Sequence, residues 1–119
     1  MIYLNIDDNE TNIPLIYADS FFKRFKGLMF KKDIKEGLFF SGNSVHMFFM
    51  KEPIDILILN KKSKIIGLYE NAKPWRFAKI KTKGKIIIEL PQGSIQKHNI
   101  TENSNIYFKV DKKKKKTSK

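Results

Sequence analysis

The chain contains no cysteine among its 119 residues. This absence excludes disulfide bridges, thiolate metal ligands and a cysteine nucleophile. Long apolar runs are missing too, since none approaches the roughly 20 residues that a membrane-spanning helix requires. The first ten residues, MIYLNIDDNE, carry acidic but no basic side chains, which is unlike a secretory signal peptide. We therefore expect a cytoplasmic protein with no transmembrane segment.

Familiar catalytic motifs are absent as well. The sequence has no G-x-G-x-x-G, no Walker-type loop, no G-x-S-x-G and no H-E-x-x-H. His46 and His98 are the only histidines, so a three-ligand zinc site would have to depend on carboxylates. We expect no metal and no cofactor, and a non-enzymatic role is favoured over an enzymatic one.

Positive charge is in excess. There are 24 Lys and Arg against 12 Asp and Glu, a net charge of +12. Segment 112–119 holds six of the lysines and no acid, which leaves residues 1–111 at +6. Arg24 and Arg76 are the only arginines, whereas phosphate-reading surfaces usually use the bidentate arginine fork. Solvated surface charge is therefore favoured over a functional polyanion surface.

The lysine-rich tail keeps a second interpretation open. Segment 112–119 is expected to be disordered, and its lysines could make weak contact with nucleic acid or another anionic surface. The residues that would do so are Lys112, Lys113, Lys114, Lys115 and Lys116. Nuclear or membrane-surface targeting by the same lysines is an equal alternative.

The remaining residues, 1–111, fit one globular domain. Hydrophobic residues make up 41% of the chain, enough for one core. Short apolar segments recur at regular intervals with turns between them, which predicts a mainly β fold, a sandwich or partly closed barrel with one or two short helices. The expected strands cover 2–7, 13–18, 37–40, 45–50, 54–59, 64–69, 78–81, 85–90 and 106–110.

Local signals refine this layout. Residues 8–12 read as a turn, and Pro14 is a residue that an edge strand tolerates. Asp19 or Ser20 can cap a short helix that ends near Gly27. Gly67 indicates a bulge. Residues 71–77 read as a loop, and 94–98 as one helical turn.

Three of the expected strands are nearly continuous apolar runs, which implies burial on both faces. Each carries one ionisable residue: His46, Asp55 or Glu89. A buried charge without a partner costs several kcal/mol. Each of the three must therefore be paired, be neutral, or lie at a strand end that opens to water.

Each candidate has a structural alternative. His46 could be a general base or a satisfied core residue. Asp55 could be catalytic or could accept backbone N–H bonds at its strand start. Glu89 could be catalytic or could form a structural pair with an arginine or lysine. Arg76 could bind an anion or lie over Trp75 as a cation–π contact, and Arg24 could bind a ligand or staple the short helix.

Several stretches together resemble a known family. They are Arg24–Met29, Val45–Asp55 with its His-x-Phe-Phe-Met-x-x-Pro-Ile-Asp pattern, Lys73–Arg76, and Glu89-Leu90-Pro91-Gln92-Gly93. The order of these stretches resembles that in the family called domain of unknown function 192. The resemblance covers about residues 18–106. The resemblance implies a compact β sandwich or barrel-like fold, and it implies no activity.

Three functions follow from these residues. The leading hypothesis is an accessory or ligand-binding β domain, with a polar site for a small or polymeric ligand. Its residues would be Arg24, His46, Asp55, Arg76 and Glu89. The second is a hydrolase-like enzyme with His46 as base and Asp55 or Glu89 as its partner. The third is polyanion binding through the lysine tail.

Overall fold

A computed structural model of the protein describes residues 2–17, 34–42, 52–73 and 86–110, together with the backbone of 45–46 and 77–78. The expected helix beginning at Asp19 or Ser20 and the lysine tail lie outside the described residues.

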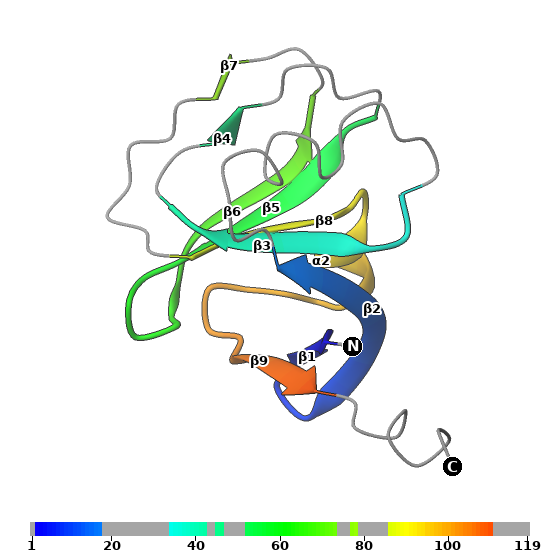
Figure 1. The fold of residues 1–119 in the computed structure, drawn as a ribbon, viewed down its shortest axis with the longest axis vertical. Coiled ribbons are helices and arrows are strands. Elements are labelled where there is room, and N and C mark those ends of the chain that lie inside the picture. The colour runs from blue at the N-terminus through cyan, green and yellow to red at the C-terminus, as the bar shows by residue number, and fades with distance from the viewer. Residues whose placement is uncertain are drawn as a thin grey trace.

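The described strands form one large sheet and one small one (Figure 1). The strands are β1 (Ile2–Ile6), β2 (Asn9–Tyr17), β3 (Gly37–Ser41), β4 (Val45–His46), β5 (Ile54–Leu59), β6 (Ile65–Ala72), β7 (Phe77–Ala78), β8 (Ile86–Pro91) and β9 (Ile106–Val110). The seven-stranded sheet has the order β6-β5-β8-β3-β2-β1-β9, and β4 pairs with β7. The large sheet curls into a half-barrel, which confirms the predicted fold class.

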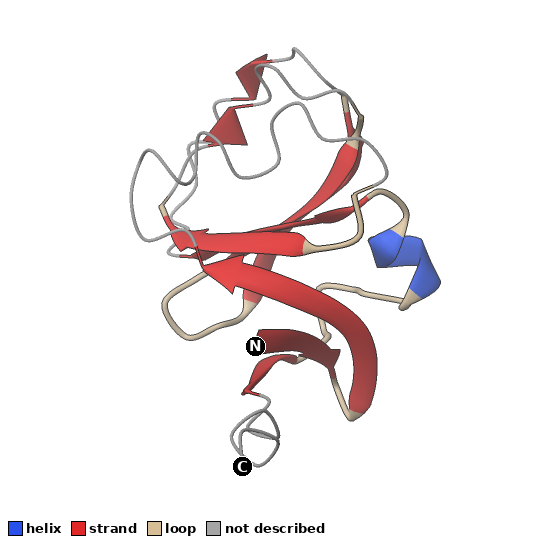
Figure 2. Ribbon diagram, turned by 45° about the vertical axis from the view of Figure 1, so that its right-hand side comes forward, coloured by secondary structure: helices blue, strands red, loops and turns tan. Residues whose placement is uncertain are grey.

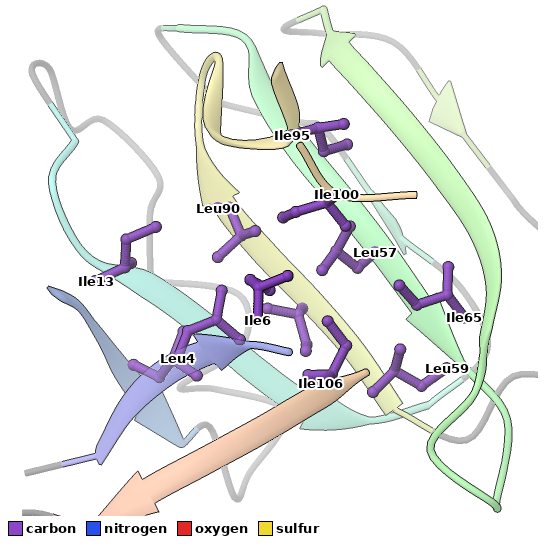
Figure 3. Close-up of a cluster of buried hydrophobic side chains, with 12 residues drawn as sticks. Leu4, Ile6, Ile13, Leu57, Leu59, Ile65, Leu90, Ile95, Ile100 and Ile106 are labelled. Atoms are coloured by element: carbon purple, nitrogen blue, oxygen red, sulfur yellow. The ribbon is translucent and has the colours of Figure 1, made fainter. Parts of the chain in front are cut away.

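Both faces of the central strands are buried. Every residue of β5 is buried, and the side chains of β5 alternate between two apolar clusters. The inner core lies within the curl (Figure 3) and is formed by Leu4, Ile6, Ile13, Leu15, Leu57, Leu59, Ile65, Ile88, Leu90, Ile95, Ile100 and Ile106. The outer core lies on the opposite face and is formed by Ile34, Leu38, Phe40, Ile54, Ile56, Ile58 and Ile87.

The first hairpin corrects the predicted turn at 8–12. The turn is Asp7 and Asp8, and β2 already begins at Asn9. The polar residues that follow continue the strand through a bulge opposite Leu4. There the buried Thr11 hydroxyl donates to the Leu4 carbonyl at 2.6 Å and accepts from the Ile13 N–H at 3.2 Å. These bonds satisfy groups that the ladder leaves unpaired.

Pro14 lies in a strand that is internal to the sheet rather than at its edge. β2 pairs with β1 antiparallel and with β3 parallel. The parallel pairing covers only Leu15 to Tyr17, however, so among the described strands Pro14 pairs with β1 alone. The missing proline N–H therefore costs the sheet no bond to β3.

The β5–β6 hairpin contains the expected bulge beside Gly67. Ile58 pairs with Gly67 and Leu59 with Ile65, so Ile66 is the extra residue. A second irregularity near Asn71 lets β6 continue to Ala72, two residues into the segment predicted as a loop.

The described helix, α2 (Ser94–Lys97), is one turn, as predicted. Figure 2 shows it in blue at the right-hand side of the molecule, next to the ends of the large sheet's strands. Among the described residues, no helix is long and apolar enough to cross a membrane.

Gly37 is required by close packing, so Gly37→Ala is expected to lower the free energy of unfolding by about 1–3 kcal/mol. A Cβ there would lie 2.8 Å from the Glu89 carbonyl oxygen and 2.7 Å from Leu15 Cδ2. Gly67→Ala is the matched control, because its nearest contact, the Tyr69 ring at 3.1 Å, can move. Urea denaturation would measure both, and equal losses would contradict this account.

Candidate functional site

Asp55 points into the inner core. It lies in β5 next to Ile54, pairs across strands with Leu90, and is 1% exposed. Its neighbours on the same face are Leu57 and Leu59, which belong to the inner core. A charge in this position has to be satisfied by fixed hydrogen-bond donors.

One donor to Asp55 comes from a bulge in β6. Ile54 pairs with Ala72 and Ile56 with Tyr69, so β6 has one residue more than β5 in this interval. Asn71 lies at the irregularity with a φ of 53°, and its N–H donates to Asp55 Oδ1 at 3.0 Å. The carboxylate thus replaces the ladder partner that a bulge residue lacks.

The second donor comes from α2. The Ile95 N–H donates to Asp55 Oδ2 at 2.8 Å. Gly93 precedes the helix in the left-handed region with a φ of 87°, and the Ser94 hydroxyl donates to the Pro91 carbonyl at 2.6 Å. Asp55 therefore occupies the place of a side-chain cap, reached from another strand. Both carboxylate oxygens of Asp55 accept backbone N–H groups. This is the structural role that the sequence offered for Asp55 as the alternative to a catalytic one.

Glu89 points to the opposite face of the same sheet. Its cross-strand partners are Leu38 on β3 and Ile56 on β5, both members of the outer core. Glu89 is 8% exposed. Its carboxyl group has no hydrogen bond or ion pair to any residue in the described parts of the chain. Burial raises the pKa of Glu89 from 4.5 to about 8.

His46 is placed by its backbone. It lies in β4 and pairs with Phe77 of β7. Both ribbon views show the β4–β7 pair on the side of the large sheet away from β1, β9 and α2 (Figures 1 and 2). This is the side that Glu89 faces.

The structure separates the two acidic candidates. Asp55 faces the inner core and Glu89 the outer core, so the two carboxyl groups do not share a site. The remaining candidates, Arg24, Arg76 and Lys112–Lys116, lie outside the described residues. The second histidine, His98, lies at the end of α2, where partial burial and then the Lys97 ammonium lower its pKa.

Sequence reasoning missed a cleft at the seam of the half-barrel. It has a volume of about 360 Å³ and lies between the β5–β6 turn and the segment leading into β9. Lys62, Lys64, Glu102 and Tyr107 are among its lining residues. The two sides are about 40 residues apart in the chain, so no local pattern indicates that they meet.

Comparisons with known proteins agree with the fold. The family described as Uncharacterized ACR, domain of unknown function 192, matches residues 2–108. A UPF0127 protein from Thermococcus sibiricus is 36% identical over 82% of this chain and 67% of its own length. A UPF0127 protein from Pyrococcus furiosus is 40% identical over 73% of this chain and 79% of its own length.

Two solved structures have a similar fold. A protein of unknown function from Novosphingobium aromaticivorans superimposes with a TM-score of 0.75 at 18% identity, covering 88% of this chain and 83% of that chain. A candidate transcription regulator from Sinorhizobium meliloti gives a TM-score of 0.74 at 19% identity, covering 90% and 91%.

Asp55→Asn should destabilise the protein by about 2 kcal/mol or more, because hydrogen bonds to charged groups contribute roughly 1.5–3 kcal/mol. The amide places an NH₂ group against either the Asn71 or the Ile95 N–H, where an oxygen now accepts. Urea denaturation measures the loss, and hydrogen exchange should show faster exchange at the Asn71 and Ile95 amides.

Asp7→Asn is the matched control. Asp7 is exposed and accepts the Asn105 N–H through one oxygen, which an asparagine retains. Its φ of 53° is one that asparagine tolerates. If Asp55→Asn lowered the stability no more than Asp7→Asn does, the hydrogen bonds to the buried carboxylate would not contribute to holding the fold together.

Proposed function

The chain belongs to the domain of unknown function 192 family, and from the geometry of its sheet we propose that it is a ligand-binding domain whose site lies on the outer face, around Glu89. The observation that carries this proposal is a buried carboxyl group on an otherwise apolar face, without a partner in the described residues. Such a group lowers stability when it stays unsatisfied. A ligand with a complementary polar group would remove that cost.

The surroundings of Glu89 define the class of ligand. Leu38, Ile56 and Ile87 supply aliphatic surface on the same face, which favours an apolar ligand body. With a pKa of about 8, the Glu89 carboxyl is mostly protonated at pH 7. It can donate a hydrogen bond to a neutral acceptor, or ionise against a cation. A ligand with an apolar body and one neutral or cationic polar group fits these properties best.

An enzymatic function is the second proposal. β4, which carries His46, lies on the side of the sheet that Glu89 faces. We propose that His46 and Glu89 act together there, because a histidine paired with a carboxyl group of raised pKa is a pattern found at acid–base sites. Asp55 is not part of this proposal, because its oxygens accept the Asn71 and Ile95 N–H groups on the opposite face. Ligand turnover that depends on both His46 and Glu89 would favour the enzyme over the binding domain.

Binding of polyanions through Lys112–Lys116 is a separate proposal that does not involve the sheet. It is supported by the excess charge alone, half of which lies in segment 112–119. Its signature is an affinity for nucleic acid that falls steeply with salt and is lost when this segment is removed.

The raised pKa makes stability depend on pH in a defined direction. The folded state retains a proton on Glu89 that the unfolded chain releases above pH 4.5, so stability falls as pH rises from about 4.5 to about 8. The slope should be of order 1 kcal/mol per pH unit. Glu89→Gln, which cannot ionise, should remove this slope in urea denaturation at pH 5, 6.5 and 8.

Glu102→Gln is the control, because Glu102 is exposed. It makes the same chemical change at the surface and should leave the slope of the wild-type protein intact. If Glu89→Gln retained the wild-type slope, the Glu89 carboxyl would be ionised throughout, and a neutral buried acid could not be the basis of the site.

Ligand class can be tested with octylamine, octanol and octanoate below their aggregation limits. At tenfold excess over Kd, a bound ligand stabilises by about 1.4 kcal/mol, a shift in Tm of several degrees. Octylamine or octanol should raise the Tm, octanoate should not, and Glu89→Gln should reduce the octylamine shift. Equal shifts in the wild type and Glu89→Gln, or none with any of the three, would argue against this site.

A further inference from the structure

We propose that the outer edge of β9 and the adjoining seam cleft form a docking surface for an extended acidic peptide, which would add a strand to the half-barrel. This surface is distinct from the Glu89 face and does not depend on the ligand-binding proposal. It comprises β9 (Ile106–Val110), the β5–β6 turn at 60–64 and segment 102–105.

The outer edge of β9 has no strand partner in the described part of the chain. In the sheet order β6-β5-β8-β3-β2-β1-β9, β9 is terminal and pairs with β1 through every residue from Ile106 to Val110. On its other side, the described strands include no partner. Half of the N–H and C=O groups of an edge strand point away from the sheet, where an added strand can bind them.

The two edges of the curled sheet approach one another at the cleft. Ile106 of β9 and Ile65 of β6 both enter the inner core, and Figure 3 shows them with Leu59 around the same space. The cleft of about 360 Å³ lies where these edges meet the surface. A strand added to β9 would therefore run along this seam and place one of its ends at the cleft.

The side chains of β9 set the pattern of the partner. Tyr107 and Lys109 alternate with Ile106 and Phe108, so apolar and polar side chains face opposite sides of the sheet. Tyr107 is 52% and Val110 56% exposed, which leaves apolar surface uncovered on this strand. Cross-strand neighbours stabilise a sheet when both are apolar or oppositely charged. A partner that alternates apolar and polar residues matches both sides of β9; because Lys109 is paired with Glu10, the choice of an acidic partner rests on the lysines beside the cleft.

Charge selects an acidic partner rather than a second copy of the chain. The turn beside the cleft is Lys61-Lys62-Ser63-Lys64, and the lysine segment 112–119 follows β9 closely in sequence. Glu102 is the acid among the cleft residues, while Glu10 already pairs with Lys109. Two copies aligned along β9 would bring these lysines together, and each chain has a net charge of +12. Lysines at an edge are a known guard against self-pairing.

The test uses a fluorescein-labelled, acetylated (Val-Glu)₄ peptide, with (Val-Lys)₄ as the charge-reversed probe, in fluorescence anisotropy with the full chain. We expect (Val-Glu)₄ to bind at least tenfold more tightly than (Val-Lys)₄. Lys62→Glu/Lys64→Glu should weaken (Val-Glu)₄ binding at least tenfold. Lys73→Glu/Lys97→Glu, the matched change at exposed positions near the other end of β5, should change it less than twofold.

Strand addition is distinguished from simple charge attraction by N-methylation of the peptide at alternate residues. Methylation of the set whose N–H groups face β9 should abolish binding, and methylation of the other set should not. The bound peptide should also slow hydrogen exchange at the amides of 106–110. If the two methylated peptides bind equally, no strand is added and the proposal is wrong.

Two other outcomes would overturn the proposal. If the chain dimerises in analytical sedimentation, and substitutions in β9 abolish the dimer, then a second copy of the chain is the occupant of this surface. The attraction would belong to the tail alone if three results came together. Removal of 112–119 would abolish peptide binding, Lys62→Glu/Lys64→Glu would leave it unchanged, and single-stranded DNA would compete equally well. Retained binding after removal of 112–119, with the methylation pattern above, supports the β9 edge.

Discussion

Burial of β5 and β8 on both faces is the constraint from which the other features follow. These strands pair along their length and separate the inner core from the outer core. Water cannot satisfy polar groups there, so each acid on the two strands needs a donor from the protein, a proton or a ligand. Asp55 has two backbone donors, whereas Glu89 has a raised pKa and no partner in the described chain. The same constraint thus produces a structural acid on one face and a candidate recognition group on the other.

The Asp55 carboxylate also explains why two separated sequence motifs occur together. Pro-Ile-Asp starts β5 and Glu-Leu-Pro-x-Gly ends β8, and the pairing of Ile54 with Pro91 brings them side by side. The turn at Gly93 then aims the α2 N–H group of Ile95 back at Asp55. Part of the sequence that carries the family resemblance therefore holds a strand, a bulge and a helical turn together. This leaves Glu89 as the motif acid whose position is not accounted for by packing.

Much of the fold could be predicted from residue patterns, because two-face burial of β5 and β8 leaves continuous apolar runs and because Gly67 and Pro91-Gln92-Gly93 mark real irregularities. The start of β2 could not, since Thr11 is satisfied by the distant Leu4 carbonyl and a polar stretch therefore stays in the sheet. The opposite orientation of Asp55 and Glu89 depends on the register between β5 and β8, which one-strand periodicity does not reveal. The seam cleft likewise depends on how far the sheet curls.

The pairing of β1 with β9 has a consequence for synthesis. Ile2 lies opposite Val110, so the first described strand of the chain is completed by the last. During translation β1 and β2 can form their hairpin early, but the outer edge of β1 stays open until residues 106–110 have left the ribosome. Contacts so distant in sequence form slowly, because the loop that they close is long. Until then Leu4 and Ile6, which end in the inner core, have no β9 beside them, and this unpaired edge is open to pairing with a wrong partner.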